Sequence, residues 1–301
     1  MKVASLPLVL PAAGFSGDRR QLVRHLPVPS AIVAYSRGRF SRAIKGIYPT
    51  DDGNLLLGFG DWNLNGGKVP VLEIDPVRGA VLDQSFPLRT ENISTLRNTD
   101  DGLIAPYTDP VGASFEDTPS GRKWRVYARR DSAGSWVECG DMRQIIHAFD
   151  AVVLGGKLFL CGSVYPGHAA VITPGDDAVA GEVVAAEPER GDFHRFYRFY
   201  PHTDMTRRLY NSGTGQAYIF DGHALVPDTS GWSPAVTALM CPRSDYQLVI
   251  SSTRWRLYRP DGVLVWDFRG WGEPPTAFAF VGEGFWVGYG NGSIKYCALE
   301  R

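Results

Sequence analysis

The stretch Asp51-Asp-Gly-Asn-Leu-Leu-Leu-Gly-Phe-Gly60 contains the unit that decides the fold, a tight turn followed by a short apolar run. Runs of this length, and alternating runs such as Trp255-Arg-Leu-Tyr-Arg259, are typical of β-strands. The Asp- and Gly-rich links supply the positive φ angles that tight hairpins need. Since no stretch keeps a 3.6-residue apolar period for a dozen residues, the sequence predicts an all-β protein.

The same turn-and-strand unit recurs six times along the chain. The six turns are Asp51–Gly53, Asp100–Gly102, Gly155–Gly156, Asp204–Met205, Ser244–Asp245 and Glu283–Gly284. Successive turns are about 40 to 54 residues apart, the spacing expected for one four-stranded propeller blade per repeat. We therefore predict one β-propeller domain over residues 1–301, with six blades. A pair of β-sandwiches, which also yields many short strands, remains the alternative.

The sixth repeat lacks its fourth strand. In the other repeats this strand reads AVLDQSF, SWVEC, EVVAAE, ALVPD or VLVWDF, but the sixth stops at Arg301. An unpaired sheet edge invites aggregation. We expect the N-terminal segment 1–40, with candidate strands Leu6–Leu10 and Ala31–Tyr35, to supply the missing strand and close the ring.

Composition excludes several classes of function. The 31 basic and 32 acidic residues leave a net charge of −1, which gives no support to binding of nucleic acid or anionic membranes. No apolar run is long enough for a membrane helix. The N-terminus faintly resembles a secretory signal, but two prolines interrupt its apolar run. The four cysteines and six histidines lack the spacings of zinc sites, so we expect neither metal nor cofactor.

The loop after the first apolar run is the best candidate for a ligand site. Trp62 is suited to stacking on a sugar ring, and Asp61, Asn63 and Asn65 are suited to hydrogen-bonding its hydroxyls. In the alternative interpretation the polar side chains only cap a turn while the tryptophan packs on a neighbouring blade.

The same loop resembles a known family. The stretch GFGDWNLNGG, followed by VPVLEIDP, resembles a G-[YF]-G-D-[YW]-x-x-N-x-G-P-[IV] signature of minor tail proteins of tailed bacteriophages, particularly those of actinobacteria. Lys68 stands where that family usually has proline. The resemblance implies a non-enzymatic, multi-copy tail-tip protein on the virion. Its implied partners are other tail-tip proteins and a glycan or receptor on the host surface.

An enzyme is the alternative function. No G-x-S-x-G motif is present, and we assign no catalytic residue. A carbohydrate-active propeller enzyme, a glycosidase or a lyase, would need acids that face each other. The candidates by position are Asp61, Glu73, Asp75, Glu116 and Asp117. The aromatic and basic run Phe193–His202 is suited to stacking and anion pairing, or to an inter-blade strand whose side chains alternate between two faces.

Overall fold

The computed structural model describes most of the blade framework. The described residues are 22–26, 43–60, 71–78, 80–85, 92–99, 102–108, 126–140, 142, 146–164, 168–175, 181–187, 195–203, 205–211, 213–234, 237–242, 246–251, 254–259, 261–269, 273–281 and 284–298.

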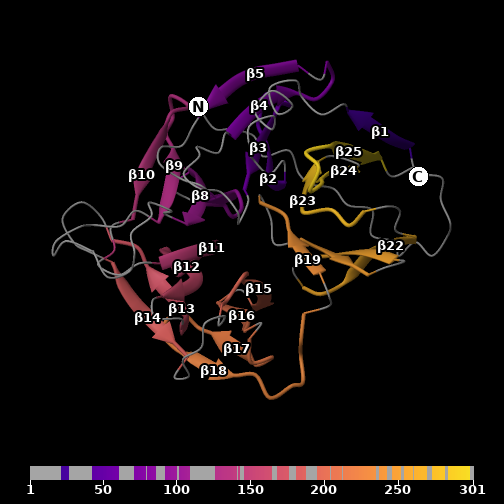
Figure 1. Cartoon of the computed structure of the whole chain (residues 1–301). Helices are drawn as coiled ribbons and strands as arrows, with labels where there is room; N and C mark the ends of the chain where they lie inside the picture. The colour runs from indigo at the N-terminus through magenta and orange to yellow at the C-terminus, as the bar shows by residue number, and fades with distance from the viewer. Residues whose placement is uncertain are drawn as a thin grey trace.

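The described strands form six antiparallel blades around a common axis, so the predicted six-bladed β-propeller is confirmed (Figure 1). Blades 2 and 3 are joined into one sheet by the pairing of His147 with Thr108. The blades consist of the following strands: blade 1, β2 (Ile44–Pro49), β3 (Leu55–Phe59), β4 (Val71–Asp75) and β5 (Ala80–Ser85); blade 2, β6 (Asn92–Ile93), β7 (Arg97–Thr99), β8 (Gly102–Thr108), β9 (Tyr127–Arg130) and β10 (Trp136–Cys139); blade 3, β11 (Ile146–Leu154), β12 (Lys157–Val164), β13 (His168–Thr173) and β14 (Glu182–Ala186); blade 4, β15 (Tyr200–Thr203), β16 (Thr206–Tyr210), β17 (Ala217–Phe220) and β18 (Leu225–Pro227); blade 5, β19 (Thr237–Met240), β20 (Gln247–Ile250), β21 (Arg254–Tyr258) and β22 (Leu264–Arg269); blade 6, β23 (Ala277–Val281), β24 (Gly284–Gly288), β25 (Ile294–Ala298) and β1 (Leu22–Leu26).

Blade 6 is completed by the N-terminal part of the chain. Strand β1 pairs with β25 in antiparallel register, from Leu22 opposite Ala298 to Leu26 opposite Ile294. The predicted closure is therefore confirmed. The closing strand is, however, neither of the two candidates, Leu6–Leu10 and Ala31–Tyr35, which lie outside the described residues.

Neighbouring blades pack through their apolar side chains. The five residues of β3 are all buried because they alternate between two interfaces: Leu55, Leu57 and Phe59 pack against blade 6, whereas Leu56 packs against blade 2. Full burial of one leucine side chain contributes roughly 1.5–3 kcal/mol. The uninterrupted Leu55-Leu56-Leu57 run is therefore what a strand covered on both sides requires.

Two glycines allow the blades to approach closely. A Cβ on Gly288 would lie 2.7 Å from Cγ2 of Ile44 in the next blade, and one on Gly58 would lie 3.1 Å from Cγ2 of Ile93. The Gly-aromatic-Gly elements at the ends of β3 and β24 thus have a structural role in blade packing.

A buried ion pair links four blades at the axis. Arg97 of β7 donates from Nε to Oδ1 of Asp150 (2.7 Å) and from Nη2 to Oδ2 (2.9 Å), and its Nη1 donates to the carbonyl oxygen of Cys241 (2.9 Å). The Asp150 carboxylate also accepts the backbone N–H of Phe199 at 3.0 Å. We call Arg97 and Asp150 the axial clamp. It joins blades 2, 3, 4 and 5, and the backbone N–H of Asn98 adds a direct bond between opposite blades 2 and 5. The N–H of Asn98 donates this bond to the carbonyl oxygen of Pro242, at 2.9 Å.

The lower face of the ring is defined by the turns between the first two strands of each blade. The upper face is defined by the connections from one blade to the next. Pro242 follows β19 on the lower side, so opposite blades are in contact there.

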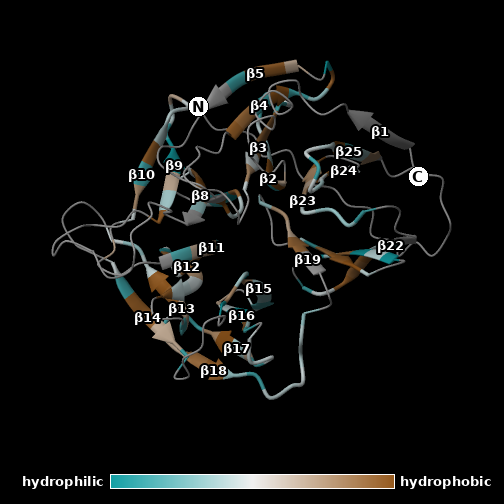
Figure 2. Ribbon diagram, in the orientation of Figure 1, coloured by the Kyte–Doolittle hydropathy of each residue, from teal (hydrophilic) through white to brown (hydrophobic). Residues whose placement is uncertain are grey.

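The outer strands carry apolar residues on the rim of the ring (Figure 2). Each of five blades exposes an aliphatic side chain on its outermost strand. These side chains are Leu82, Val137, Val183, Val226 and Leu264. They belong to five different blades and are therefore spread around the circumference.

Candidate functional site

The structure does not describe the predicted ligand loop. Asp61, Trp62, Asn63 and Asn65 lie outside the described residues, as do Glu116 and Asp117. Residues Phe59 and Gly60 before the loop lie at the upper end of β3. The assignment of these four residues as ligand-binding stays a prediction.

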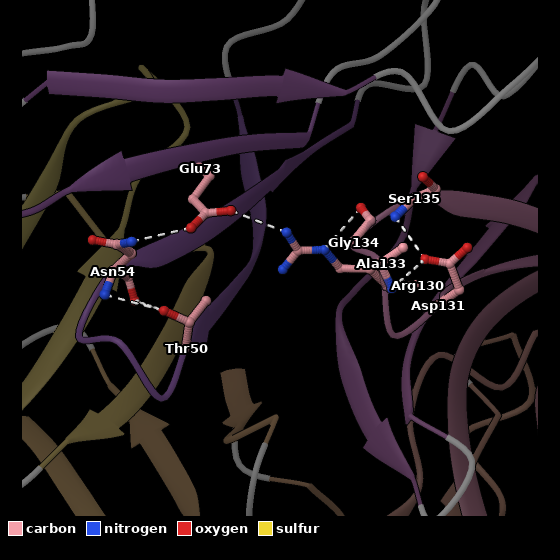
Figure 3. A network of polar contacts seen from close by, with 8 residues as sticks. All are labelled: Thr50, Asn54, Glu73, Arg130, Asp131, Ala133, Gly134 and Ser135. Atoms are coloured by element: carbon pink, nitrogen blue, oxygen red, sulfur yellow. Dashed lines mark hydrogen bonds and ion pairs between the residues drawn. The ribbon is translucent and has the colours of Figure 1, made fainter.

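The two described acids of the glycosidase hypothesis have structural partners. Oε1 of Glu73 accepts a hydrogen bond from Nδ2 of Asn54 at 3.0 Å, and Oε2 accepts one from Nη2 of Arg130 at 3.0 Å (Figure 3). Glu73 therefore links blades 1 and 2. Asp75 caps its own turn by accepting the backbone N–H groups of Val77 (2.8 Å) and Arg78 (3.0 Å). Both carboxylates are thus engaged in structural hydrogen bonds.

A histidine occupies the upper end of the innermost strand of blade 3. His147 is the second residue of β11 and lies between Thr108 of β8 and Ser163 of β12. Its Nδ1 atom is buried and has no hydrogen-bond partner within the described ranges. A buried ring nitrogen without a partner is uncommon, because desolvation costs free energy that a hydrogen bond normally offsets.

The connection from blade 3 to blade 4 brings aromatic and basic side chains to this histidine. The Cζ atom of Arg195 lies 5.9 Å from the ring centroid of Phe149, and the rings of Phe149 and Tyr197 have centroids 5.0 Å apart. Phe149 is 6% exposed, whereas Tyr197 is 39% exposed. We call His147, Phe149, Arg195 and Tyr197 the upper-face cluster.

The environment keeps His147 uncharged near neutral pH. Burial lowers the pKa of His147 below its ordinary value of 6.5, and the positive charge of Arg195 lowers the same pKa further. A neutral imidazole with a free lone pair is the form that accepts a proton.

The described part of the aromatic and basic run, residues 195–202, does not form the single alternating strand that we expected. Phe196 and Phe199, three positions apart, are both buried in the cluster between blades 3 and 4. Phe196 forms an isolated bridge with Asn211, and β15 begins only at Tyr200. The prediction of a regular two-faced strand is therefore wrong, because this segment turns to fill the inter-blade gap.

Another acid lies on the upper face but is engaged. Glu187, 3% exposed, accepts a hydrogen bond from Nδ2 of Asn211, and its backbone carbonyl accepts Nδ1–H of His168 at 3.0 Å. These contacts hold the upper ends of β13 and β16 together. Glu187 thus serves the junction of blades 3 and 4.

Within the described ranges, no group of three or more His, Cys, Asp or Glu side chains is placed to hold a metal ion. In the same part of the chain, no helix has the length and apolarity needed to cross a membrane.

No protein-family model and no curated protein matches this sequence. Solved structures do match. A catalytically inactive histidine-to-alanine variant of virginiamycin B lyase from Staphylococcus aureus, with quinupristin, is 11% identical with a TM-score of 0.58, over 93% of this chain and 100% of that one. A gluconolactonase from Xanthomonas campestris is 13% identical with a TM-score of 0.52, over 87% and 88%. An auxiliary nutrient binding protein from Bacteroides ovatus is 15% identical with a TM-score of 0.54, over 87% and 70%.

These similarities establish the fold and correct the functional hypothesis. Two of the three neighbours named above are enzymes, so the main prediction, a non-enzymatic phage tail-tip protein, is wrong. The enzyme alternative agrees better with these neighbours. The resemblance of residues 58–67 to minor tail proteins, the tail-tip and host-surface partners, and the virion location stay predictions.

Sequence reasoning missed the upper-face cluster. His147 has no second histidine at a metal-binding spacing, so it gave no motif. One signal was present, since the repeat pattern places the His147 region just before the Gly155–Gly156 turn and so on an innermost strand. Residues at the upper ends of innermost strands surround the axis.

Proposed function

We propose that this protein is a carbohydrate-active β-propeller enzyme, a lyase, and that the upper-face cluster is its reaction site. The observation that supports the proposal most directly is the position of His147. Its Nδ1 is buried without a partner among the described residues, beside Arg195 and the Phe149–Tyr197 ring pair.

The chemistry is a β-elimination. The neutral imidazole of His147 removes a proton from a sugar carbon that bears an electron-withdrawing group. The electrons of that C–H bond form a carbon–carbon double bond as the neighbouring C–O bond breaks. Arg195 stabilises the negative charge that develops on the electron-withdrawing group. The departing oxygen takes one proton, for which the phenol of Tyr197 is the candidate donor.

The described acids favour elimination over glycoside hydrolysis. A glycosidase needs two carboxyl groups about 5 to 10 Å apart on either side of the scissile bond. Glu73, Asp75, Asp150 and Glu187 each have structural hydrogen bonds. Elimination needs only one base and a positive charge, which are the groups present in the upper-face cluster.

The structural neighbours support an enzyme by analogy alone. One neighbour is named as a lyase, and its histidine-to-alanine variant is described as catalytically inactive. A second neighbour is named as a gluconolactonase. The propeller fold is thus a scaffold on which enzymes occur.

The test separates elimination from hydrolysis. The purified protein is incubated with a panel of polysaccharides while reducing ends and the ultraviolet absorbance of the new double bond are followed together. A lyase raises both signals, whereas a glycosidase raises reducing ends alone. Reducing ends without absorbance would overturn the proposal.

Variants then locate the base. We expect His147→Gln to lower the rate at least about 100-fold, the usual contribution of a general base. The matched control is His223→Gln, because His223 is exposed beside the β17–β18 turn on the lower face and should leave the rate unchanged. Full activity in His147→Gln would remove the upper-face cluster as the reaction site.

A further inference from the structure

A β-bulge interrupts the innermost strand of blade 3 beside the upper-face cluster. The register of β11 against β12 shifts between Ala148 and Asp150, which makes Phe149 the extra residue. Bulges re-aim the side chains around them and are frequent next to reaction sites. This bulge lies between His147 and the aspartate of the axial clamp.

The bulge brings His147 and Asp150 to the same face of β11. Their partners on β12 are Ser163 and Cys161, which are two positions apart and therefore point to one side of the sheet. Cys161 packs in the apolar cluster between blades 3 and 4, together with Phe199. The histidine and the aspartate thus both face the segment that connects these blades.

The Asp150 carboxylate holds that segment directly. Its Oδ2 accepts the backbone N–H of Phe199 at 3.0 Å, just before β15 begins, so a side chain takes the place of a ladder bond there. Its Oδ1 accepts the N–H of Ala151 at 2.9 Å, and the two hydrogen bonds from Arg97 hold both oxygens in place. Because Asp150 is only 1% exposed, these bonds are stronger than they would be in water.

A second bond fixes the other end of the segment. The N–H of Phe196 donates to the carbonyl oxygen of Gly162 in β12 at 3.2 Å. Tyr197 lies between the two attachment points, with its ring centroid 5.0 Å from that of Phe149. Arg195 lies just before the first attachment point, with its Cζ 5.9 Å from the same Phe149 centroid. The positions of both side chains relative to β11 therefore depend on these two bonds.

We infer that Asp150 is a positioning residue of the reaction site: its carboxylate holds residues 195–199 against β11 and so sets the position of the cluster's arginine and tyrosine beside the base. The inference rests on the proposed function, because it concerns the groups that carry out the elimination. Asp150 acts through these side chains and not through contact with the substrate. Such positioning matters because a misplacement of about 1 Å can lower a rate roughly 100-fold.

Two double substitutions test the bond to the segment. Arg97→Met with Asp150→Leu leaves no acceptor for the N–H of Phe199, whereas Arg97→Met with Asp150→Asn keeps an amide oxygen at that place. Both proteins lack the same two charges, so the comparison isolates the bond to Phe199. The measured quantity is the pKa of His147, followed by NMR in a pH titration, with His147→Gln to assign its signal.

We expect the variant with Asp150→Leu to have a raised His147 pKa, closer to the ordinary value, because the released segment carries the charge of Arg195 away. Thr108 and Ser163, the cross-strand neighbours of His147, are uncharged, and Arg195 is the described charge that acts on this pKa. The variant with Asp150→Asn should keep the lowered pKa of the wild-type protein. Equal pKa values in the two variants would overturn the inference.

Hydrogen exchange in the wild-type protein gives a test that needs no substitution. The N–H of Phe199 should exchange as slowly as the amides of β11, because its acceptor is a buried carboxylate. Exchange as fast as that of an exposed turn would show that Asp150 does not hold the segment, whether or not the variants fold.

The proposed function and the positioning role fail in different ways. In the lyase assay, the variant with Asp150→Leu should lose up to about 100-fold in kcat, and the variant with Asp150→Asn less than about 10-fold. Equal kcat values in the two variants would contradict the positioning role. If the wild-type protein cleaves no polysaccharide, the lyase reaction is wrong, but the titration and the exchange rates still decide whether Asp150 positions the segment.

Discussion

Replacing Arg97 with alanine should destabilise the protein more than replacement of any exposed arginine. The side chains of Arg97 and Asp150 are only 9% and 2% exposed, and two hydrogen bonds of 2.7 and 2.9 Å join them. Removing one partner of such a pair leaves a buried charge without compensation, which costs about 3–5 kcal/mol. The carbonyl oxygen of Cys241 also loses its donor.

The expected shift in Tm is the loss of unfolding free energy divided by the unfolding entropy, which grows with chain length. At about 2.1 cal/mol/K per residue, 301 residues give an unfolding entropy of about 0.6 kcal/mol/K. A loss of 3–5 kcal/mol therefore lowers Tm by about 5 to 8 °C. Thermal and urea unfolding followed by circular dichroism measure both quantities.

A control substitution and a double substitution test whether the axial clamp stabilises the ring. Arg254→Ala breaks an exposed pair, worth about 0–1 kcal/mol, and should shift Tm by less than about 2 °C. Arg97→Met combined with Asp150→Leu should lose less than the sum of the single losses, because neither charge is then left alone. If Arg97→Ala behaves like Arg254→Ala, or if the two losses add, the axial clamp does not hold the ring as described.

Three further outcomes follow from the structure. Because the pKa of His147 is lowered in the folded state, the unfolded chain binds its proton first, so stability should fall as pH drops below 6.5 towards the folded pKa. The pH dependence of Tm should lose this component in His147→Gln, and an unchanged profile would contradict the buried, neutral imidazole. Of the four cysteines, only the partly exposed Cys139 should react quickly with a thiol reagent in the native state. The other three are buried, and burial raises the pKa of Cys297 to about 12; mass spectrometry after brief labelling that finds Cys297 modified as fast as Cys139 would refute this. A chain that begins at Pro27 lacks β1 and leaves the outer edge of β25 unpaired, so it should melt at a lower temperature and aggregate, as measured by light scattering. An unchanged melting curve would show that β1 does not close the ring.

The repeat spacing was enough to predict the blades. Each fourth strand read from the sequence, such as ALVPD and SWVEC, overlaps an outer strand of the structure, β18 and β10. The local pattern determines these strands, because each needs only a turn and an alternation that matches the pleat. The run Leu55-Leu56-Leu57 also marked a strand that is covered on both sides.

Contacts between blades were not predictable in the same way. Arg97 lies 53 residues from Asp150 and 144 from Cys241, and only closure of the ring brings them together. The upper-face cluster has the same origin, since His147 and Arg195 come from an inner strand and from the following connection. A repeat pattern specifies each unit, whereas the side chains that meet at the axis depend on the angle between units.

The pairing of β1 with β25 joins two strands of one sheet that are separated by almost the whole polypeptide. During synthesis β1 leaves the ribosome before the other described strands and β25 leaves after them, so β1 stays unpaired while the chain between them is made. Contacts of such long sequence separation are slow to form, and an unpaired strand is open to pairing with other chains in the meantime. Completion of blade 6 is therefore expected to be the late event of folding, and a helper that covers β1 until then would raise the yield of native protein.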